Sequence, residues 1–322
     1  MKYGNVSGLD KPISRIVHGT IKTSSKELEK SLSVLDSAFE HGINAFDTAH
    51  VYGGGDNERT VGRWVHERGI REEITIIGKG AHHNPDRNRV TPWDITADIH
   101  DSLARFKFDY IDLYLLHRDD PTQPVGPIVE TLNEHWAAGR IRAFGGSNWT
   151  HQRIQEANEY AQAHGLTPFV ASSPNFSLAE QLQEPWPNCI TISGPAGAEA
   201  REWYTREGLA MFTWSSLAGG FFSGRFTRDN LNQFTDNYDK LAAKCYCSED
   251  NFRRLDRAQE LAAERGATVA QIALAYVLNQ PANIFALTAG ANDDEIRANA
   301  EAGEIVLSAE EIAWLDLKRD ER

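Results

Sequence analysis

The sequence is poor in the features that mark secreted, membrane-spanning or nucleic-acid-binding proteins. Its three cysteines, Cys189, Cys245 and Cys247, are too few and too clustered for a disulfide framework. No apolar run approaches the ~20 residues that cross a bilayer, and the N-terminus lacks the apolar segment of a signal peptide. The 33 Lys and Arg are outnumbered by 46 Asp and Glu, and no basic stripe interrupts this acidic background. We therefore expect a cytoplasmic protein without a nucleic-acid or membrane partner.

The chain also lacks any stretch that would divide it into separate units. No Pro/Ser-rich linker, composition shift, short-period repeat or low-complexity tract occurs in the 322 residues. Hydrophobic residues make up 41% and charged residues 25%, close to the average of soluble globular proteins, so a sizeable core is available. We expect one domain over residues 1–322, present as a monomer or a small homo-oligomer.

Short apolar runs alternate with longer amphipathic segments along the chain, which is typical of repeated β-α units. Leu28, Leu32, Leu35 and Phe39 recur at helical spacing, and Gly42 follows as a stop signal. About eight such units predict a (β/α)8 TIM barrel with C-terminal helices, and a doubly wound open sheet is the weaker alternative. The expected strands are residues 15–20, 43–48, 74–79, 111–117, 141–147, 168–173, 209–214 and 284–290.

Two irregular stretches interrupt the alternation, residues 186–199 and a long polar loop after the seventh strand, residues 216–250. Loops of that length are usually functional covers of a site. In a (β/α)8 barrel the reactive groups stand at the C-terminal ends of the strands. The polar residues expected there are Asp47, Lys79, His117, Ser147 with Asn148, Ser172 with Ser173, and Ser215 with Ser216.

Each of these residues also has an ordinary structural role. A strand-end Asp is often a turn former, a strand-end Lys a solvated charge, and a lone His a structural residue. Their convergence on one rim favours a site, and with Tyr52 of the following loop they suit proton delivery to a carbonyl group. Lys79 would lower the pKa of the Tyr52 phenol from its usual value near ~10, Asp47 would keep Lys79 charged, and His117 would hydrogen-bond the carbonyl oxygen.

This set contains no redox-active group, so a reduced nicotinamide cofactor must supply the hydride. At this point the sequence resembles the aldo-keto reductase family. The matching stretches, from residue 19 to residue 299, are "INAFDTAHVYGGGDNERTVG", "IIGKG", "IDLYLLHRDDP", "FGGSN", "FTWSSLAGGFFSGRF" and "AGANDDEIRAN". The resemblance implies a (β/α)8 barrel that binds NAD(P)(H) across its C-terminal face without a GxGxxG motif. It also implies a catalytic tetrad of Asp47, Tyr52, Lys79 and His117, with Tyr52 as proton donor.

The resemblance further implies a set of cofactor contacts. Ser147 and Asn148 would hold the nicotinamide carboxamide, and Trp214 would stack on the nicotinamide ring. The pyrophosphate loop would contain Ser215, Leu217 and Ser223. Ser173 stands where the family usually has a glutamine, and its shorter hydroxyl can hold only part of what an amide holds. The remaining expected cofactor contacts are Gly19, Thr20, Ser216, Arg225, Gly290, Asn292, Asp293 and Asn299.

Residues 292–295 depart from the family pattern in a way that bears on the cofactor. NADP-using members generally have a Ser and an Arg or Lys near this stretch, whereas this chain has Asn292, Asp293, Asp294 and Glu295. Carboxylates repel a 2'-phosphate and accept hydrogen bonds from a free ribose, which slightly favours NAD(H) over NADP(H). The alternative is that the same residues are only the N-cap and acidic first turn of a helix, with Arg297 still able to reach a phosphate.

The substrate is expected to be a small polar molecule, a sugar or a small aldehyde or ketone, because the chain lacks the long C-terminal tail with which some family members recognise bulky hydrophobes. Histidine, arginine and tryptophan in the loops suit a sugar, although they suit a solvated rim equally well. The expected substrate contacts are Ile21, His50, His82, Trp93 and Arg118, with His83, Asp119 and residues 186–199 nearby.

Two other functions remain open from the sequence. A metal-dependent hydrolase would need His117, Asp119, Asp120 and His82 or His83 as ligands, yet "VHGT" on the first strand offers no H-x-H partner. Some relatives of the family are non-catalytic, cofactor-sensing subunits of membrane channels. The intact tetrad favours turnover over that role. Cys245 and Cys247 have no further ligands beside them and are interpreted as incidental.

Overall fold

The computed structural model describes residues 1–322, and its central feature is a closed barrel of eight parallel strands. The strands follow one another around the barrel in chain order, and β10 pairs with both β9 and β3 to close it. This confirms the barrel and excludes the open sheet. The strands are β3 (Ile16–Gly19), β4 (Ala45–Asp47), β5 (Thr75–Gly80), β6 (Ile111–Leu116), β7 (Ile141–Ser147), β8 (Ala171–Ser173), β9 (Ala210–Thr213) and β10 (Ile284–Thr288).

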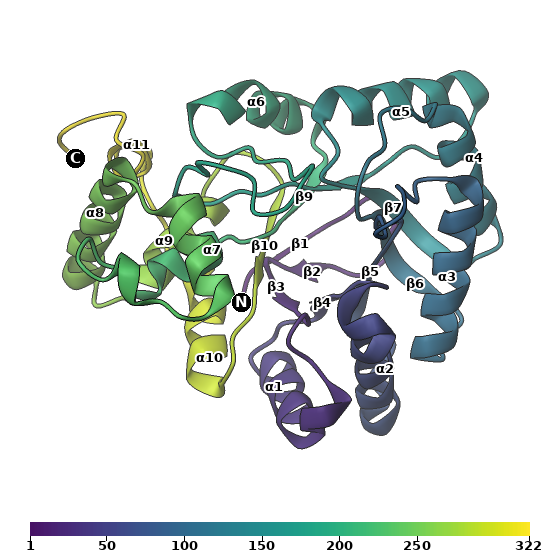
Figure 1. Ribbon diagram of the computed structural model, residues 1–322, viewed down its shortest axis with the longest axis horizontal. Coiled ribbons are helices and arrows are strands. Elements are labelled where there is room, and N and C mark those ends of the chain that lie inside the picture. Colours follow the sequence, from purple (N-terminus) through teal and green to yellow (C-terminus); the bar gives the residue numbers. More distant parts are fainter.

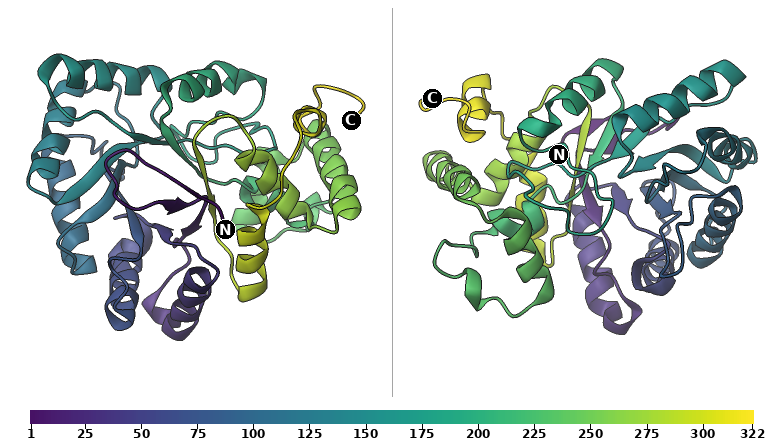
Figure 2. Two further views of the ribbon diagram at one scale, coloured as in Figure 1. Left: turned by 180° about the vertical axis from the view of Figure 1, so that it is seen from behind. Right: turned by 45° about the horizontal axis from the view of Figure 1, so that its top comes forward.

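Helices surround the strands on the outside, and α7, α8 and α11 lie together at one side of the barrel (Figure 1 and Figure 2). None of them combines the length and the apolar character needed to cross a bilayer. The α-helices are α1 (Leu28–Glu40), α2 (Asp56–Arg68), α3 (Pro92–Phe106), α4 (Val125–Ala137), α5 (His151–His164), α6 (Ala198–Glu207), α7 (Asn237–Tyr246), α8 (Glu249–Arg265), α9 (Val269–Leu278), α10 (Asp293–Ala302) and α11 (Ala309–Leu315). Short 3-10 helices are η1 (Ser25–Glu27), η2 (Tyr52–Gly55), η3 (Pro195–Gly197), η4 (Ala218–Ser223) and η5 (Leu231–Gln233).

The stretch after the seventh barrel strand is not the continuous loop expected from its polar composition. It contains η4, η5 and the ten-residue helix α7. Asp236 caps α7 by accepting hydrogen bonds from the backbone N–H groups of Tyr238 and Asp239. The buried side of α7 consists of only three residues, Ala242, Cys245 and Tyr246. This apolar pattern is too short to indicate a helix in a sequence stretch that is otherwise polar.

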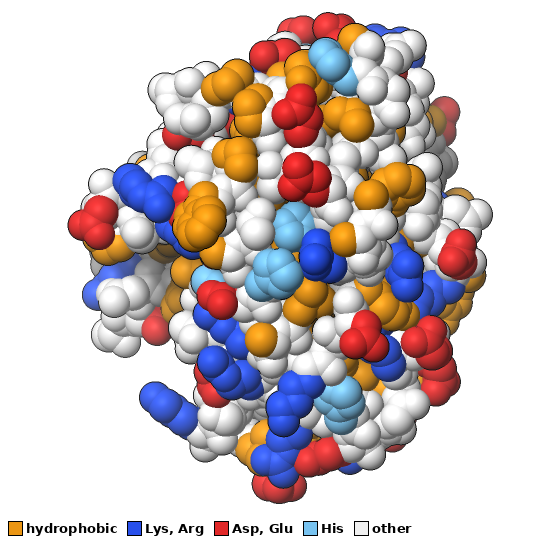
Figure 3. Space-filling view, turned by 90° about the vertical axis from the view of Figure 1, so that its right-hand side faces the viewer, with side chains coloured by type: hydrophobic (Ala, Val, Ile, Leu, Met, Phe, Trp, Pro, Cys, Tyr) orange, Lys and Arg blue, Asp and Glu red, His pale blue; other side chains and the backbone are white.

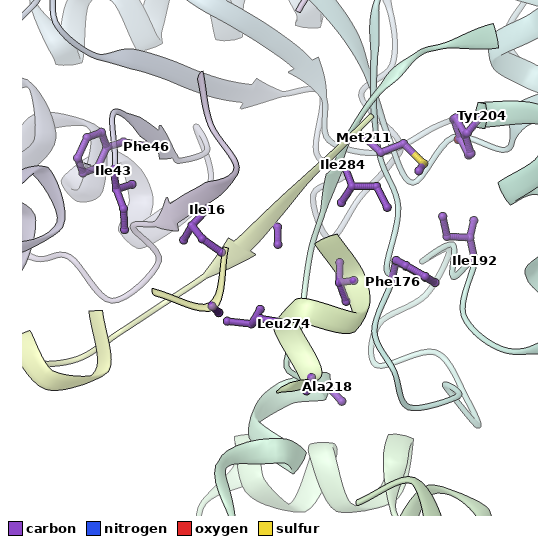
Figure 4. Packing of buried hydrophobic residues seen from close by; sticks show 14 of the residues in the cluster. Ile16, Ile43, Phe46, Phe176, Ile192, Tyr204, Met211, Ala218, Leu274 and Ile284 are labelled. Carbon is purple, nitrogen blue, oxygen red and sulfur yellow. The ribbon is translucent and has the colours of Figure 1, made fainter. Parts of the chain in front are cut away.

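Side chains of the barrel strands alternate between two cores. The outward-facing side chains pack against the helices, as Figure 4 shows for Met211 and Ile284 of neighbouring strands and Leu274 of α9. The inward-facing side chains form a smaller cluster inside the barrel, which includes Ile77 and Leu113. This alternation decides which residues at the strand ends face the interior.

A short antiparallel hairpin, β1 (Tyr3–Gly4) and β2 (Ile13–Ser14), precedes the barrel and was not expected from the sequence. Its Val6 and Ile13 belong to the cluster inside the barrel. The backbone N–H of Ser14 donates to Oδ1 of Asn44, which lies just before β4. The hairpin therefore covers the N-terminal end of the barrel, and the C-terminal ends of the strands form the opposite mouth.

The outer face on the right of Figure 1 carries acidic and basic side chains interspersed with each other (Figure 3). Hydrophobic side chains on this face are scattered in small groups. Mixed charge of this kind is typical of an ordinary solvated surface.

Candidate active site

Three of the expected catalytic side chains face the barrel interior, because every second side chain of a strand points to the same side. Ala45, Ile77 and Leu115 belong to the inner cluster, and two residues further on stand Asp47, Lys79 and His117. Adjacent strands bring these positions together, since Asp47 pairs with Ile77 and Lys79 pairs with Leu115. The strand register thus places three polar side chains at neighbouring points of the mouth.

Tyr52 reaches the same place from the turn that follows β4. Gly53 and Gly54 have φ of 56° and 61°, left-handed values that favour glycine, so the chain can turn away directly after the tyrosine. The Tyr52 ring lies edge-on to the His117 ring, with centroids 5.8 Å apart. Nζ of Lys79 lies 5.5 Å from the centroid of the Tyr52 ring. All four members of the expected tetrad therefore converge.

Asp47 and Lys79 form a buried ion pair with 2.5 Å between Oδ1 and Nζ. Burial raises the pKa of Asp47 and lowers the pKa of Lys79, and in both cases the opposite charge of the partner works against the shift. The second carboxylate oxygen, Oδ2 of Asp47, has no hydrogen-bond partner. Each residue therefore depends on the other for its charge in this low-dielectric site.

Burial is also the largest cause of the pKa shifts of Tyr52 and His117. It raises the pKa of Tyr52, and the Asp47 charge adds to the increase. The charge of Arg118 opposes this increase, and the expected lowering by Lys79 stays a prediction. Burial first, and then the Lys79 and Arg118 charges, hold the pKa of His117 well below its usual value. At neutral pH the site thus presents a protonated phenol beside a neutral imidazole.

Strained backbone marks the ends of three barrel strands. Ala81 follows β5, Asn148 follows β7 and Ser215 follows β9, with φ of 58°, 58° and 50°. Residues other than glycine seldom adopt these left-handed values, and such residues gather at functional sites. The strain therefore coincides with the mouth that the tetrad occupies.

The hydroxyl and amide residues expected after β7 and β8 are joined to the tetrad. Oγ of Ser147 donates to the Ser173 carbonyl over 3.1 Å, and Nδ2 of Asn148 donates to the His117 carbonyl over 3.3 Å. Oδ1 of Asn148 accepts from the backbone N–H of Ile190, which belongs to the irregular stretch 186–199. The amide of Asn148 thus links a catalytic strand to a loop that covers the mouth.

Of the residues that follow β9, one supports the turn from the inside and others are exposed to solvent. Ser216 is buried, and its hydroxyl donates to the Thr213 carbonyl over 2.8 Å, so it supports the turn. Leu217 precedes η4, Ser223 is exposed at its end, and Arg225 pairs with Asp239 over 2.9 Å. The side chains of Ser223 and Arg225 therefore remain accessible to an anion.

The acidic residues at the start of α10 are engaged within the protein. Asn292 is the N-cap, and its Oδ1 accepts from the backbone N–H of Glu295. Oδ1 of Asp293 accepts from Oγ of Ser37 at 2.7 Å and lies 2.8 Å from Nε2 of His41. Asp294 pairs with Arg297 at 2.5 Å. The capping alternative is therefore realised, and Asp293 is turned toward α1.

The other expected cofactor residues lie around the same end of the barrel. Gly19 ends β3, and Oγ1 of Thr20 donates to the Asp47 carbonyl over 3.0 Å. Asn299 is buried on α10, and Gly290 lies in the turn after β10.

Of the expected substrate residues, the structure brings two to the tetrad. The His82 and His117 rings have centroids 4.9 Å apart, and Nη1 of Arg118 donates to the His117 carbonyl over 2.9 Å. His50 instead lies 3.2 Å from Oδ2 of Asp101. Ile21 is 46% exposed and Trp93 is 81% exposed, so both are largely open to solvent.

Comparison with known proteins decides the family. The aldo/keto reductase family model matches residues 15–320. The chain belongs to this family. A rice protein (Oryza sativa subsp. japonica) named as a probable voltage-gated potassium channel subunit beta is 26% identical over 95% of this chain and 92% of its own length. An aldo-keto reductase of Bacillus subtilis is 27% identical over 97% and 91% of the two chains.

A solved aldo/keto reductase from Klebsiella pneumoniae, in complex with NADP and acetate, superimposes with a TM-score of 0.70. It is 25% identical and covers 97% of this chain and 93% of its own. The chain thus shares the fold over nearly its whole length.

The residues of this aldo/keto reductase fit a nicotinamide dinucleotide at the mouth. Trp214 continues the inward-facing series of β9, and its Nε1 is buried without a hydrogen-bond partner, which leaves a donor free for a bound group. Ser147 and Asn148 lie at the end of β7, which is separated from β9 by β8 alone. The 3-10 helix η4 contains two glycines, and Arg225 just after it is a cation that suits a pyrophosphate. Ser173 offers a hydroxyl in place of an amide at the end of β8.

Two further residues contact Trp214, and of these only Asn175 was missed by the sequence reasoning. Asn175 donates from Nδ2 to the Trp214 carbonyl over 3.1 Å and accepts through Oδ1 from Oγ1 of Thr191. Trp186 lies with its ring centroid 6.5 Å from that of Trp214. An asparagine two residues after a strand end was a signal for Asn175, whereas Trp186 belongs to the stretch 186–199 that was expected near the substrate.

The carboxylates proposed as ligands of a metal-dependent hydrolase do not join His82 and His117. Asp119 pairs with Arg153 over 3.3 Å, and Oδ1 of Asp120 accepts from the Thr122 hydroxyl. No group of three or more His, Cys, Asp or Glu side chains is placed to hold a metal ion. The three cysteines are free thiols.

Proposed function

We propose that this aldo/keto reductase transfers a hydride between a nicotinamide cofactor and the carbonyl or alcohol group of a small polar substrate. One observation carries the proposal: the Tyr52 ring lies beside both the Lys79 ammonium and the His117 imidazole at the C-terminal end of the barrel. The reductase relatives and the NADP-bound Klebsiella structure support the same chemistry.

The side chains of this chain have distinct roles in carbonyl reduction. When bound, a reduced nicotinamide would supply the hydride for the carbonyl carbon of the substrate. Tyr52, held in its protonated form by burial, donates the proton from its hydroxyl to the carbonyl oxygen. His117 is neutral and hydrogen-bonds that oxygen as negative charge develops on it. The ammonium of Lys79, held by Asp47, stabilises the phenolate that Tyr52 becomes after giving up its proton.

For the cofactor, we propose a slight preference for NAD(H). Arg297 is the cation near the start of α10 that suits a 2'-phosphate, and its guanidinium is paired with Asp294. Asp293 is bound to Ser37 of α1, so we do not expect its carboxylate to affect the choice of cofactor. The NADP of the Klebsiella relative points the other way, so direct comparison of the two cofactors is essential.

A steady-state assay tests the proposed function. Purified protein is mixed with NADH or NADPH and a panel of aldoses, keto-sugars and small aldehydes, and oxidation is followed at the nicotinamide absorbance band. We expect turnover that a metal chelator does not affect. Activity that the chelator abolishes and zinc restores would contradict the reductase assignment.

The rice relative raises a second candidate, a non-catalytic subunit that binds the cofactor without steady turnover. The same assay separates the two. A non-catalytic subunit would bind reduced cofactor, detected by quenching of tryptophan fluorescence, and would oxidise it with none of the carbonyl compounds.

A further inference from the structure

Arg118 is a buried guanidinium at the mouth that has no acidic partner. It is 7% exposed and forms no ion pair. Its one hydrogen bond within the protein runs from Nη1 to the His117 carbonyl. Nε is buried without a partner, and Nη2 has no protein acceptor but keeps contact with solvent. Nη2 is therefore an accessible donor, and Nε is an unsatisfied donor beside it.

The acidic groups nearest to Arg118 are already committed. The neighbouring Asp119 accepts from Arg153 and from the backbone N–H of Asp120. Within the tetrad, Asp47 is paired with Lys79. No Asp or Glu side chain lies within ion-pair distance of Arg118, so its charge has no acidic partner in the protein.

The charge of Arg118 acts on the reacting groups themselves. It contributes to lowering the pKa of Lys79, His82 and His117, in each case after burial, which is the largest cause. It also opposes the burial that raises the pKa of Tyr52. Because burial keeps His82 and His117 neutral, Arg118 is the uncompensated positive charge of this group of side chains.

A buried charge without a counterion is costly, and a protein that keeps one usually pairs it with something. The hydroxyl groups of a neutral sugar leave the charge uncompensated. A carboxylate or a phosphate neutralises it, and the planar guanidinium can donate two hydrogen bonds to such a group.

We propose that the substrate carries an anionic group, a carboxylate or a phosphate, which Arg118 binds through Nη2 and Nε while the carbonyl group meets Tyr52 and His117. This inference rests on the proposed reductase function and narrows its substrate class. It replaces the neutral sugar suggested by the residue types alone.

The first experiment measures anion binding without turnover. Thermal unfolding of the protein is followed with succinate or inorganic phosphate, and with dimethyl succinate as the neutral control, at constant ionic strength. We expect at least one anion to raise the midpoint, and Arg118→Met to abolish that increase. Arg63→Met, which removes one exposed arginine from α2, is the matched control and should keep the increase. Equal increases in wild type and Arg118→Met would overturn the proposal.

The second experiment measures substrate preference in two matched pairs. 4-Oxobutanoate is compared with its methyl ester, and glyceraldehyde 3-phosphate with glyceraldehyde, so the pairs distinguish a carboxylate from a phosphate. We expect wild type to favour one anion over its neutral partner in kcat/KM, and Arg118→Met to reduce that ratio about 10- to 100-fold. Should Arg118→Met fail to fold, Arg118→Lys keeps the charge without the planar fork and should still lower the ratio.

The outcomes separate this inference from the reductase function. Turnover of the neutral aldehydes without any preference for an anion would overturn the inference and leave the function intact. An anion-dependent midpoint that requires Arg118, together with no oxidation of reduced nicotinamide by any of the four compounds, would overturn the function instead.

Discussion

The two ends of the barrel are built by the same strands and differ completely in chemistry. At the N-terminal end, Val6 and Ile13 of the hairpin pack with Leu113 and other inward-facing apolar side chains. At the mouth, the same inward-facing rows continue with Asp47 and Lys79. A step of two residues along a strand therefore separates a region that stabilises the fold from one that holds reactive groups.

The mouth shows the cost of that specialisation. Asp47 Oδ2, His117 Nδ1, Arg118 Nε and Trp214 Nε1 are buried there without a hydrogen-bond partner. Unsatisfied buried polar atoms destabilise a folded protein, and proteins keep them mainly where a ligand completes them. Substitutions at the two ends should accordingly affect different quantities.

The largest effect is expected for Tyr52→Phe at the mouth. The change removes only the hydroxyl and should reduce kcat by the 10²- to 10⁴-fold typical of losing a general acid, with the thermal midpoint nearly unchanged. Cofactor affinity, measured by quenching of tryptophan fluorescence, should stay close to that of the wild type. Wild-type turnover in this variant would show that Tyr52 is not the acid.

The opposite result is expected for Leu113→Ala inside the barrel. Leu113 is fully buried, so the substitution should lower the free energy of unfolding by about 2–5 kcal/mol while kcat of the folded enzyme stays near wild type. Urea unfolding measures the first quantity and the steady-state assay the second. Leu182→Ala is the control, because Leu182 is 49% exposed and should change neither. A large loss of kcat in Leu113→Ala would mean that the two ends are coupled.

We expect a smaller effect from the energetic coupling between Asp47 and Lys79. Asp47→Asn and Lys79→Met should each impair turnover, because each leaves the other buried without its partner. The double variant should be far less damaged than the product of the single effects, with a coupling of about 0.5–3 kcal/mol in the activation free energy. Strictly multiplicative effects would show that the pair does not act as a unit.

The comparison also explains what the sequence could and could not predict. The alternation of side chains along strands and the expected strand ends predicted that Asp47, Lys79 and His117 lie together at the mouth. This worked because neighbouring parallel strands in a closed barrel can hardly shift their register relative to each other. The hairpin and α7 were missed because their apolar residues are few and gain meaning only from the core they meet.

Contacts between distant residues were beyond the sequence. Asp293 is held by Ser37, which lies 256 positions away, and no local pattern announces that contact. The shift of the Tyr52 pKa depends likewise on how much solvent the assembled mouth excludes. Charge and spacing alone do not reveal the extent of that burial.

The smallest effect is expected at the start of α10, where the carboxylates of Asp293 and Asp294 have different partners. Asp294→Asn removes the partner of Arg297 and should free that guanidinium for a 2'-phosphate. Because the pair is exposed and bridges one helical turn, the gain in affinity for NADPH relative to NADH should be only a few-fold, of the size that exposed ion pairs contribute. Asp293→Asn is the matched control: its partners are Ser37 on α1 and His41 directly after it, so it should leave the cofactor ratio unchanged. Fluorescence titration of both cofactors measures the ratio. A shift in Asp293→Asn equal to that in Asp294→Asn would show that the ratio responds to the net charge of the helix start, and that the release of Arg297 is not the cause.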